Sequence, residues 1–125
     1  MDEVLSLHIA IHGELHGDVV AMLLLVSEVR MQEGRNEEAR EITQRAVQIS
    51  QQVLGHNHHR TARAIRRLGT IIATLGDVTA AERHLRQALH IYQQALGENH
   101  PDTKATLHQL QQMERKKGGA ITTEP

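Results

Sequence analysis

The sequence predicts an all-α fold, a stack of antiparallel helix hairpins with about six helices. The main observation is an internal repeat, because two series of three glycines share an interval of 42 residues: Gly13, Gly55 and Gly97, then Gly34, Gly76 and Gly118. A fixed period of this length is typical of architectures built from stacked supersecondary units. The second observation is that apolar residues between the glycines recur at helical spacing.

Glycine, proline and helix-capping residues indicate where each predicted helix begins and ends. Glycines suit the left-handed end of a helix, and Pro101 suits a first helical turn. Asn36 resembles an N-cap, and Thr79 with Glu82 resembles a capping box. These signals predict helices near 2–12, 18–33, 36–54, 60–75, 78–96 and 101–117.

The predicted helices form one domain over residues 1–117. It comprises a partial repeat at 1–12, full repeats at 18–54 and 60–96, and a closing helix at 101–117, followed by a flexible tail at 118–125. The apolar spacing also predicts which faces are buried. One face carries Leu23, Val26 and Val29, and the face one repeat later carries Ile65, Leu68 and Ile72.

Composition narrows the function classes. The 125 residues carry a formal net charge of −1, which gives no general attraction to nucleic acid or membranes. Tyr92 is the single aromatic residue, so a base-stacking platform is not expected. No apolar run reaches the length of a membrane span, and the absence of cysteine excludes disulfides and suits a cytoplasmic protein.

The linker and the second helix of each repeat resemble the tetratricopeptide repeat, specifically the 42-residue kinesin light chain type. The residues that carry the resemblance are LGENHPDT at 96–103 and AERHLRQALHIY at 81–92. The resemblance implies a right-handed superhelix and a protein–protein interaction module or scaffold. It differs from the family pattern at the usual asparagine pair of the first helix, which is replaced by Leu24-Leu25, Arg66-Arg67 and His108-Gln109.

The register implied by the resemblance places a candidate binding surface on the concave side. Its residues are Arg63, Arg66, Arg67, Thr70, Leu24, Glu28 and His108. Arginine guanidinium groups bind carboxylates through paired hydrogen bonds, so the expected ligand is an acidic or extended peptide segment of a partner. The alternative is a solvated helix face whose arginine stems cover apolar neighbours.

A second function is assembly through exposed terminal helices, since the end faces of a helical stack are apolar unless capped. Its candidate contacts are Leu7 and Ile11 at one end and Leu107, Leu110 and Met113 at the other. Under this hypothesis the protein is a homo-oligomer.

Catalytic and metal chemistry have little support. The spacing of His8, His12 and His16 is ligand-like on a helix, but Gly13 is expected to interrupt that helix. The sequence contains no nucleophile motif or phosphate-binding glycine loop. We therefore expect no enzyme activity, no cofactor and no metal site.

Overall fold

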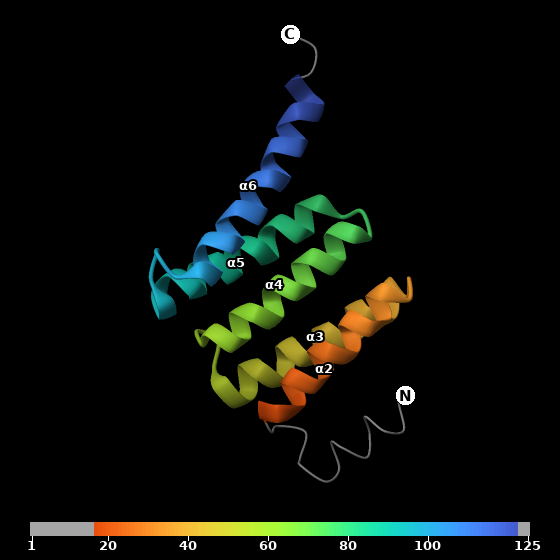
Figure 1. Ribbon diagram of the computed structural model, residues 1–125, viewed down its shortest axis with the longest axis vertical. Helices are drawn as coiled ribbons and strands as arrows, with labels where there is room; N and C mark the ends of the chain where they lie inside the picture. Colours follow the sequence, from red (N-terminus) through yellow and green to blue (C-terminus); the bar gives the residue numbers. More distant parts are fainter. Residues whose placement is uncertain (1–16, 123–125) are drawn as a thin grey trace.

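The computed structural model describes residues 17–122, with side-chain environments defined between positions 19 and 116. This part of the chain contains five helices and no strand: α2 (Gly17–Gln32), α3 (Asn36–Leu54), α4 (His59–Thr74), α5 (Val78–Leu96) and α6 (Pro101–Thr122). Each helix packs against the next in chain order, and α2 also contacts α4 (Figure 1). The all-α class is confirmed for these residues, whereas the predicted helix at 2–12 lies outside them.

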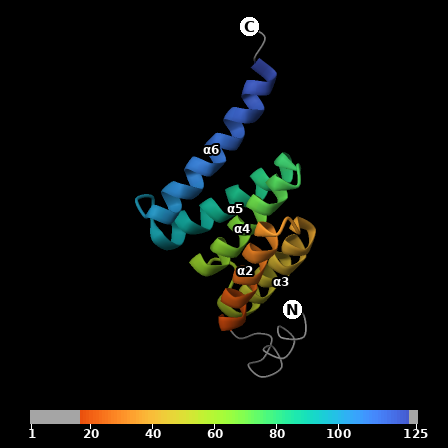
Figure 2. The same ribbon diagram turned by 45° about the vertical axis from the view of Figure 1, so that its right-hand side comes forward.

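The sequence predicted the end of the last helix too early. Residues 118–122 were assigned to a flexible tail, but α6 continues to Thr122. A glycine inside a helix costs about 1 kcal/mol relative to alanine. That cost ends a helix readily where the chain must turn back to pack, and no further helix follows α6 in the described residues. Figure 2 shows the distal half of α6 extending beyond the other helices.

The linkers after α3 and α5 have nearly the same conformation. Gly55 has φ 96° and ψ 164°, and Gly97 has φ 89° and ψ 165°. This region of backbone space is essentially limited to glycine, which explains the interval of 42 between these two residues. In both linkers a histidine Nδ1 then accepts a backbone N–H: His58 from Arg60 at 3.0 Å and His100 from Asp102 at 3.1 Å.

Two predicted helix caps are wrong. Asn36 is already the first helical residue of α3, and the cap position belongs to Arg35, which makes no side-chain cap. Before α5 the cap is Asp77, whose Oδ1 accepts the Ala80 N–H at 3.1 Å, whereas Thr79 lies inside the helix. Asp77 follows the turn glycine directly and is the better acceptor because its carboxylate is charged.

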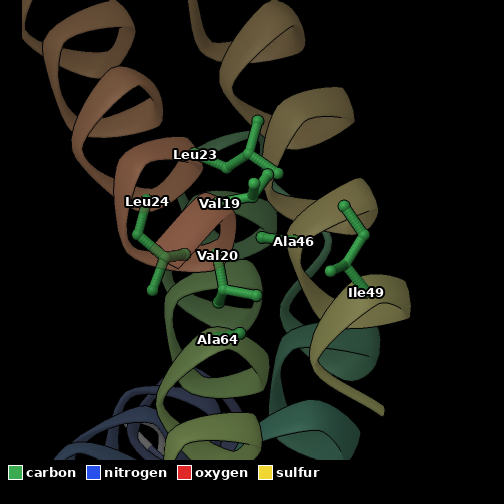
Figure 3. Packing of buried hydrophobic residues seen from close by; sticks show 7 residues of the cluster. All are labelled: Val19, Val20, Leu23, Leu24, Ala46, Ile49 and Ala64. Atoms are coloured by element: carbon green, nitrogen blue, oxygen red, sulfur yellow. The ribbon is translucent and has the colours of Figure 1, made fainter. Parts of the chain in front are cut away.

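The first core cluster joins α2, α3 and α4. Its buried members are Val19, Val20, Leu23, Leu24, Ala46, Ile49 and Ala64. Figure 3 shows the four α2 side chains directed toward α3 and α4, where the small Ala46 and Ala64 leave room for them. The short alanine side chains therefore let three helices approach one another at this point.

The α4–α5 contact forms the second and third clusters. Ile65, Ala62, Ala88, Ile91 and Tyr92 make one of them, and Leu68, Ile72 and Ala81 make the other. The helices cross closely at Gly69, where an added Cβ would lie 3.3 Å from the Ala81 carbonyl oxygen. The predicted apolar face of α4 is thus confirmed, since Ile65, Leu68 and Ile72 are all buried.

The predicted apolar face of α2 is only partly correct. Leu23 is fully buried, but Val26 is half-buried and Val29 is 41% exposed. Ile71, which lies 42 residues after Val29, is fully buried. The difference arises because α4 is packed between α3 and α5, whereas α2 has a described neighbour on one side only.

The closing helix α6 buries the face that it turns toward α5. Thr103, Thr106 and Leu110 are buried on this face, and Met113 packs against the Leu68 cluster. The opposite face is polar at two of three positions. Lys104, Leu107 and Gln111 correspond to Ala62, Ile65 and Gly69 of α4 and are exposed. The outer side of α6 therefore carries little of the apolar surface that α4 uses to bind α5.

Candidate functional site

A groove of about 450 Å³ opens between α4 and its neighbours and is lined mainly by α4. Its lining residues are Met31, Arg63, Arg66, Arg67, Thr70 and Gln109. All four predicted α4 residues of the binding surface thus share one depression, with Met31 contributed by α2 and Gln109 by α6. We call this depression the arginine groove.

The orientation of Arg66 is fixed by a hydrogen-bond chain between α4 and α6. Its Nε donates to Gln109 Oε1 at 3.0 Å, and Gln109 Nε2 donates to Thr70 Oγ1 at 2.7 Å. The Thr70 hydroxyl then donates to the Arg66 carbonyl at 3.1 Å. Gln109 engages Nε and the guanidinium also hydrogen-bonds the Tyr92 hydroxyl, so the Nη hydrogens that Tyr92 does not engage are the Arg66 donors that remain for a ligand.

The other two arginines are held less firmly. Arg67 Nη1 lies 3.5 Å from Glu28 Oε1, which is long compared with about 2.8 Å for a strong charge-assisted bond. Arg63 is exposed and has no carboxylate partner among the described residues. The arginine groove is therefore lined by three cations and no carboxylate, and Glu28 approaches it only through its long contact with Arg67.

Tyr92 lies beneath this cluster and is 2% exposed. Its burial, together with the Asp102 carboxylate, raises the pKa of Tyr92 above its ordinary value, although Arg66 and Arg63 act in the opposite direction. The phenol is therefore neutral at physiological pH and does not neutralise the arginines above it.

A smaller pocket of about 170 Å³ adjoins the arginine groove and shares Arg63 and Arg67 with it. The rest of its lining comes from α2: Ala21, Leu24, Leu25 and Glu28. Leu25 is 65% exposed, which is unusual for a leucine, whereas Leu24 is only 6% exposed and offers little contact area. We call this depression the leucine pocket.

The predicted surface residues are divided between the two depressions, and one of them lines neither. Arg63, Arg66, Arg67 and Thr70 line the arginine groove, and Leu24 and Glu28 line the leucine pocket. His108 is exposed on α6 and lines neither depression. The sequence analysis did not select Leu25, Met31 and Gln109. The repeat could have identified two of them, because Leu25 and Gln109 each lie 42 residues from Arg67.

Two of the residues predicted as oligomer contacts face the core: Leu110 is buried and Met113 is partly buried. Leu110 is 5% exposed and Met113 packs against the core, because both lie on the face of α6 that docks on α5. Leu107 is 38% exposed. Leu7 and Ile11 lie outside the described residues, as do His8, His12 and His16.

Neither metal nor membrane chemistry is visible in the part of the chain that the structure describes. Within it, no group of three or more histidine or acidic side chains is placed to hold a metal ion. His58 and His59 stack on each other with ring centroids 4.5 Å apart, and His58 serves as a helix cap. No helix in the same residues is long and apolar enough to span a bilayer.

The sequence is similar to one known protein family. A family model described as tetratricopeptide repeat matches residues 18–94 and 61–118, two overlapping segments that together cover α2 to α5 and most of α6. No curated protein matches the sequence.

Proposed function

Because this chain belongs to the tetratricopeptide repeat family, whose repeats generally mediate protein–protein interactions, we propose that it binds an acidic, extended segment of a partner protein in the arginine groove. The proposal includes the kinesin light chain-like subtype and the right-handed superhelix of that resemblance. In such a superhelix the first helices of successive repeats line the concave side. The module acts by equilibrium binding and needs no cofactor.

One observation carries the proposal: three guanidinium groups line a single groove whose lining includes no carboxylate. The excess positive charge attracts an acidic segment, because the protein as a whole carries almost no net charge to compete with it. Arg66 is also pre-oriented by Gln109, so little side-chain entropy is lost when a ligand carboxylate binds its Nη groups. These features favour acidic peptides over neutral ones.

The test uses NMR titration of the ¹⁵N-labelled full chain with the capped peptide Gly-Asp-Glu-Asp-Gly. We expect amide shifts concentrated on α4 around Arg63 to Thr70. Arg63→Glu should weaken binding by about tenfold or more, since hydrogen bonds to charged groups contribute roughly 1.5–3 kcal/mol. Arg83→Glu is the matched control, because Arg83 is exposed on α5 and lines neither depression.

Two outcomes would contradict the proposal. One is a set of shifts that avoids α4, and the other is an affinity that Arg63→Glu and Arg83→Glu change equally.

End-to-end assembly is the weaker alternative. Of its α6 contacts only Leu107 is exposed, and it lies between the polar Lys104 and Gln111. Stable protein interfaces bury on the order of 1,000 Å² or more, which one leucine cannot supply. Light scattering of the free chain distinguishes the two functions.

A further inference from the structure

The chemistry of the binding surface changes from one repeat to the next. The positions of Arg66 and Arg67 on α4 are occupied 42 residues earlier by Leu24 and Leu25. The position of Arg63 is occupied by Ala21 in the same register. Along the stack the surface is therefore aliphatic on α2 and cationic on α4.

The two depressions adjoin each other, because Arg63 and Arg67 line both. A single extended segment can therefore contact them together. The leucine pocket has about 170 Å³, and an apolar cavity of about 150 Å³ holds a benzene molecule. Its size thus suits one apolar side chain rather than a whole ligand.

Glu28 decides which part of a ligand lies over α2. Glu28 lines the leucine pocket, and its Oε1 lies 3.5 Å from Arg67 Nη1. A ligand carboxylate in that pocket would meet Glu28 as well as Arg63 and Arg67, whereas in the arginine groove it meets three arginines and no carboxylate, which is the more favourable site. The acidic group is thereby directed toward Arg63 and Arg66, and an uncharged group is left to fill the pocket.

We propose that the bound segment carries an apolar side chain of leucine size close to its acidic residues, with the apolar group in the leucine pocket and the acidic group in the arginine groove. This inference rests on the proposed function and adds a second, apolar requirement to it. Leu25 is the main determinant, since 65% of its surface is exposed and would be covered by such a side chain. An acidic segment without the apolar residue binds more weakly.

The test compares two capped peptides, Gly-Leu-Gly-Asp-Glu-Gly and its counterpart with Ser in place of Leu. Each is also synthesised in reverse order, so that both directions of the bound chain are tested. NMR titration of the full chain is expected to show about tenfold tighter binding of the Leu peptide in at least one order, the effect of burying one leucine side chain. Its amide shifts should extend from α4 onto α2 near Leu25.

Two variants test whether the preference for the Leu peptide arises at Leu25. Leu25→Asn should remove most of the difference between the Leu and Ser peptides. Val29→Asn is the matched control, because Val29 is an exposed aliphatic residue on the same helix that lines neither depression. It should leave the tenfold preference unchanged.

The outcomes separate the two proposals. Equal binding of the Leu and Ser peptides at α4 overturns the apolar subsite and leaves the acidic groove standing. A leucine preference that survives Leu25→Asn also overturns it, because the preference then arises elsewhere. Shifts that avoid α4 for every peptide overturn the proposed function itself.

Discussion

Thr61 and Thr103 occupy equivalent positions in successive repeats but have different hydrogen bonding, so one substitution should affect them in opposite ways. Both are buried near the start of a helix, and they are 42 residues apart. The Thr61 hydroxyl donates to the Gly55 carbonyl at 2.7 Å and lies 2.8 Å from Ser50 Oγ. The Thr103 hydroxyl has no hydrogen-bond partner among the described residues, and Tyr92 stands where Ser50 does.

The magnitude follows from these contacts. Thr→Val keeps the branched shape and removes the hydroxyl. At Thr61 two hydrogen bonds are lost and the Ser50 hydroxyl loses its Thr61 partner, which should destabilise the fold by about 1–3 kcal/mol. At Thr103 the change removes a buried hydroxyl that makes no bond, and burying such a group costs roughly 1–3 kcal/mol. Thr103→Val should therefore be neutral or stabilising by about 1 kcal/mol.

The assay is urea unfolding of both variants, followed by circular dichroism at the helical band. With a typical slope of about 2 kcal/mol per molar urea, Thr61→Val should lower the midpoint by about 0.5–1.5 M. Thr103→Val should leave the midpoint unchanged or raise it. Equal destabilisation by the two substitutions would refute the reasoning, since it would show that the hydrogen bonds at Thr61 add nothing to stability.

Three further predictions concern the linkers and the ends. The pKa of His58 is lowered by burial and then by nearby positive charge, so its unfolded form binds the proton more readily. The stability that neutral His58 contributes is complete above the unfolded pKa of about 6.5 and is lost as the pH falls below it. His58→Asn keeps a helix cap and should therefore reduce the loss of stability between pH 7 and pH 5. An unaltered dependence of stability on pH would contradict this. Gly97→Ala should lower the free energy of unfolding by about 1–3 kcal/mol in thermal unfolding because φ is 89°, and a stable variant would show that the linker can rearrange. Leu110→Ala should cost about 2–5 kcal/mol, whereas Leu107→Asp should change stability by less than about 1 kcal/mol; equal effects in urea unfolding would mean that α6 packs on α5 differently.

The repeat made the turns predictable, because a glycine with positive φ is required at the same point of each copy. Gly34, Gly55, Gly76 and Gly97 all have φ between 81° and 102°, a conformation that other residues rarely adopt. The same register predicts that Arg63, Arg66 and Arg67 share one surface, and all three line the arginine groove. These features depend on local backbone geometry and helical spacing, and both can be predicted from a sequence.

Features that depend on neighbouring helices were harder to predict. Leu110 was expected to be exposed because no helix was predicted after it, but its face docks on the preceding helix instead. Arg30 lies where the next repeat has Ile72, and it is 6% exposed with its guanidinium 3.0 Å from Glu33 and 3.7 Å from Glu38. A sequence pattern does not distinguish such a buried arginine, paired with two exposed glutamates, from a solvated charge.

The binding surface was predicted in type but not in extent. The arginines were visible as a cluster of one residue type on one helix. The leucine pocket was not, because it needs side chains from both α2 and α4 to meet around Arg63 and Arg67. Leu25 resembles any other residue of an apolar run until the tertiary structure shows that 65% of it is exposed.

The contrast between the two outer faces of the stack has a consequence for protein engineering. Val29 and its half-buried neighbour Val26 on α2 could accept an additional hairpin fused ahead of them, because they are already aliphatic. A hairpin fused after α6 would have to pack on Lys104 and Gln111, which stand where α4 has Ala62 and Gly69. Designed extension of this scaffold is therefore directional, and lengthening it beyond α6 requires redesign of that helix first.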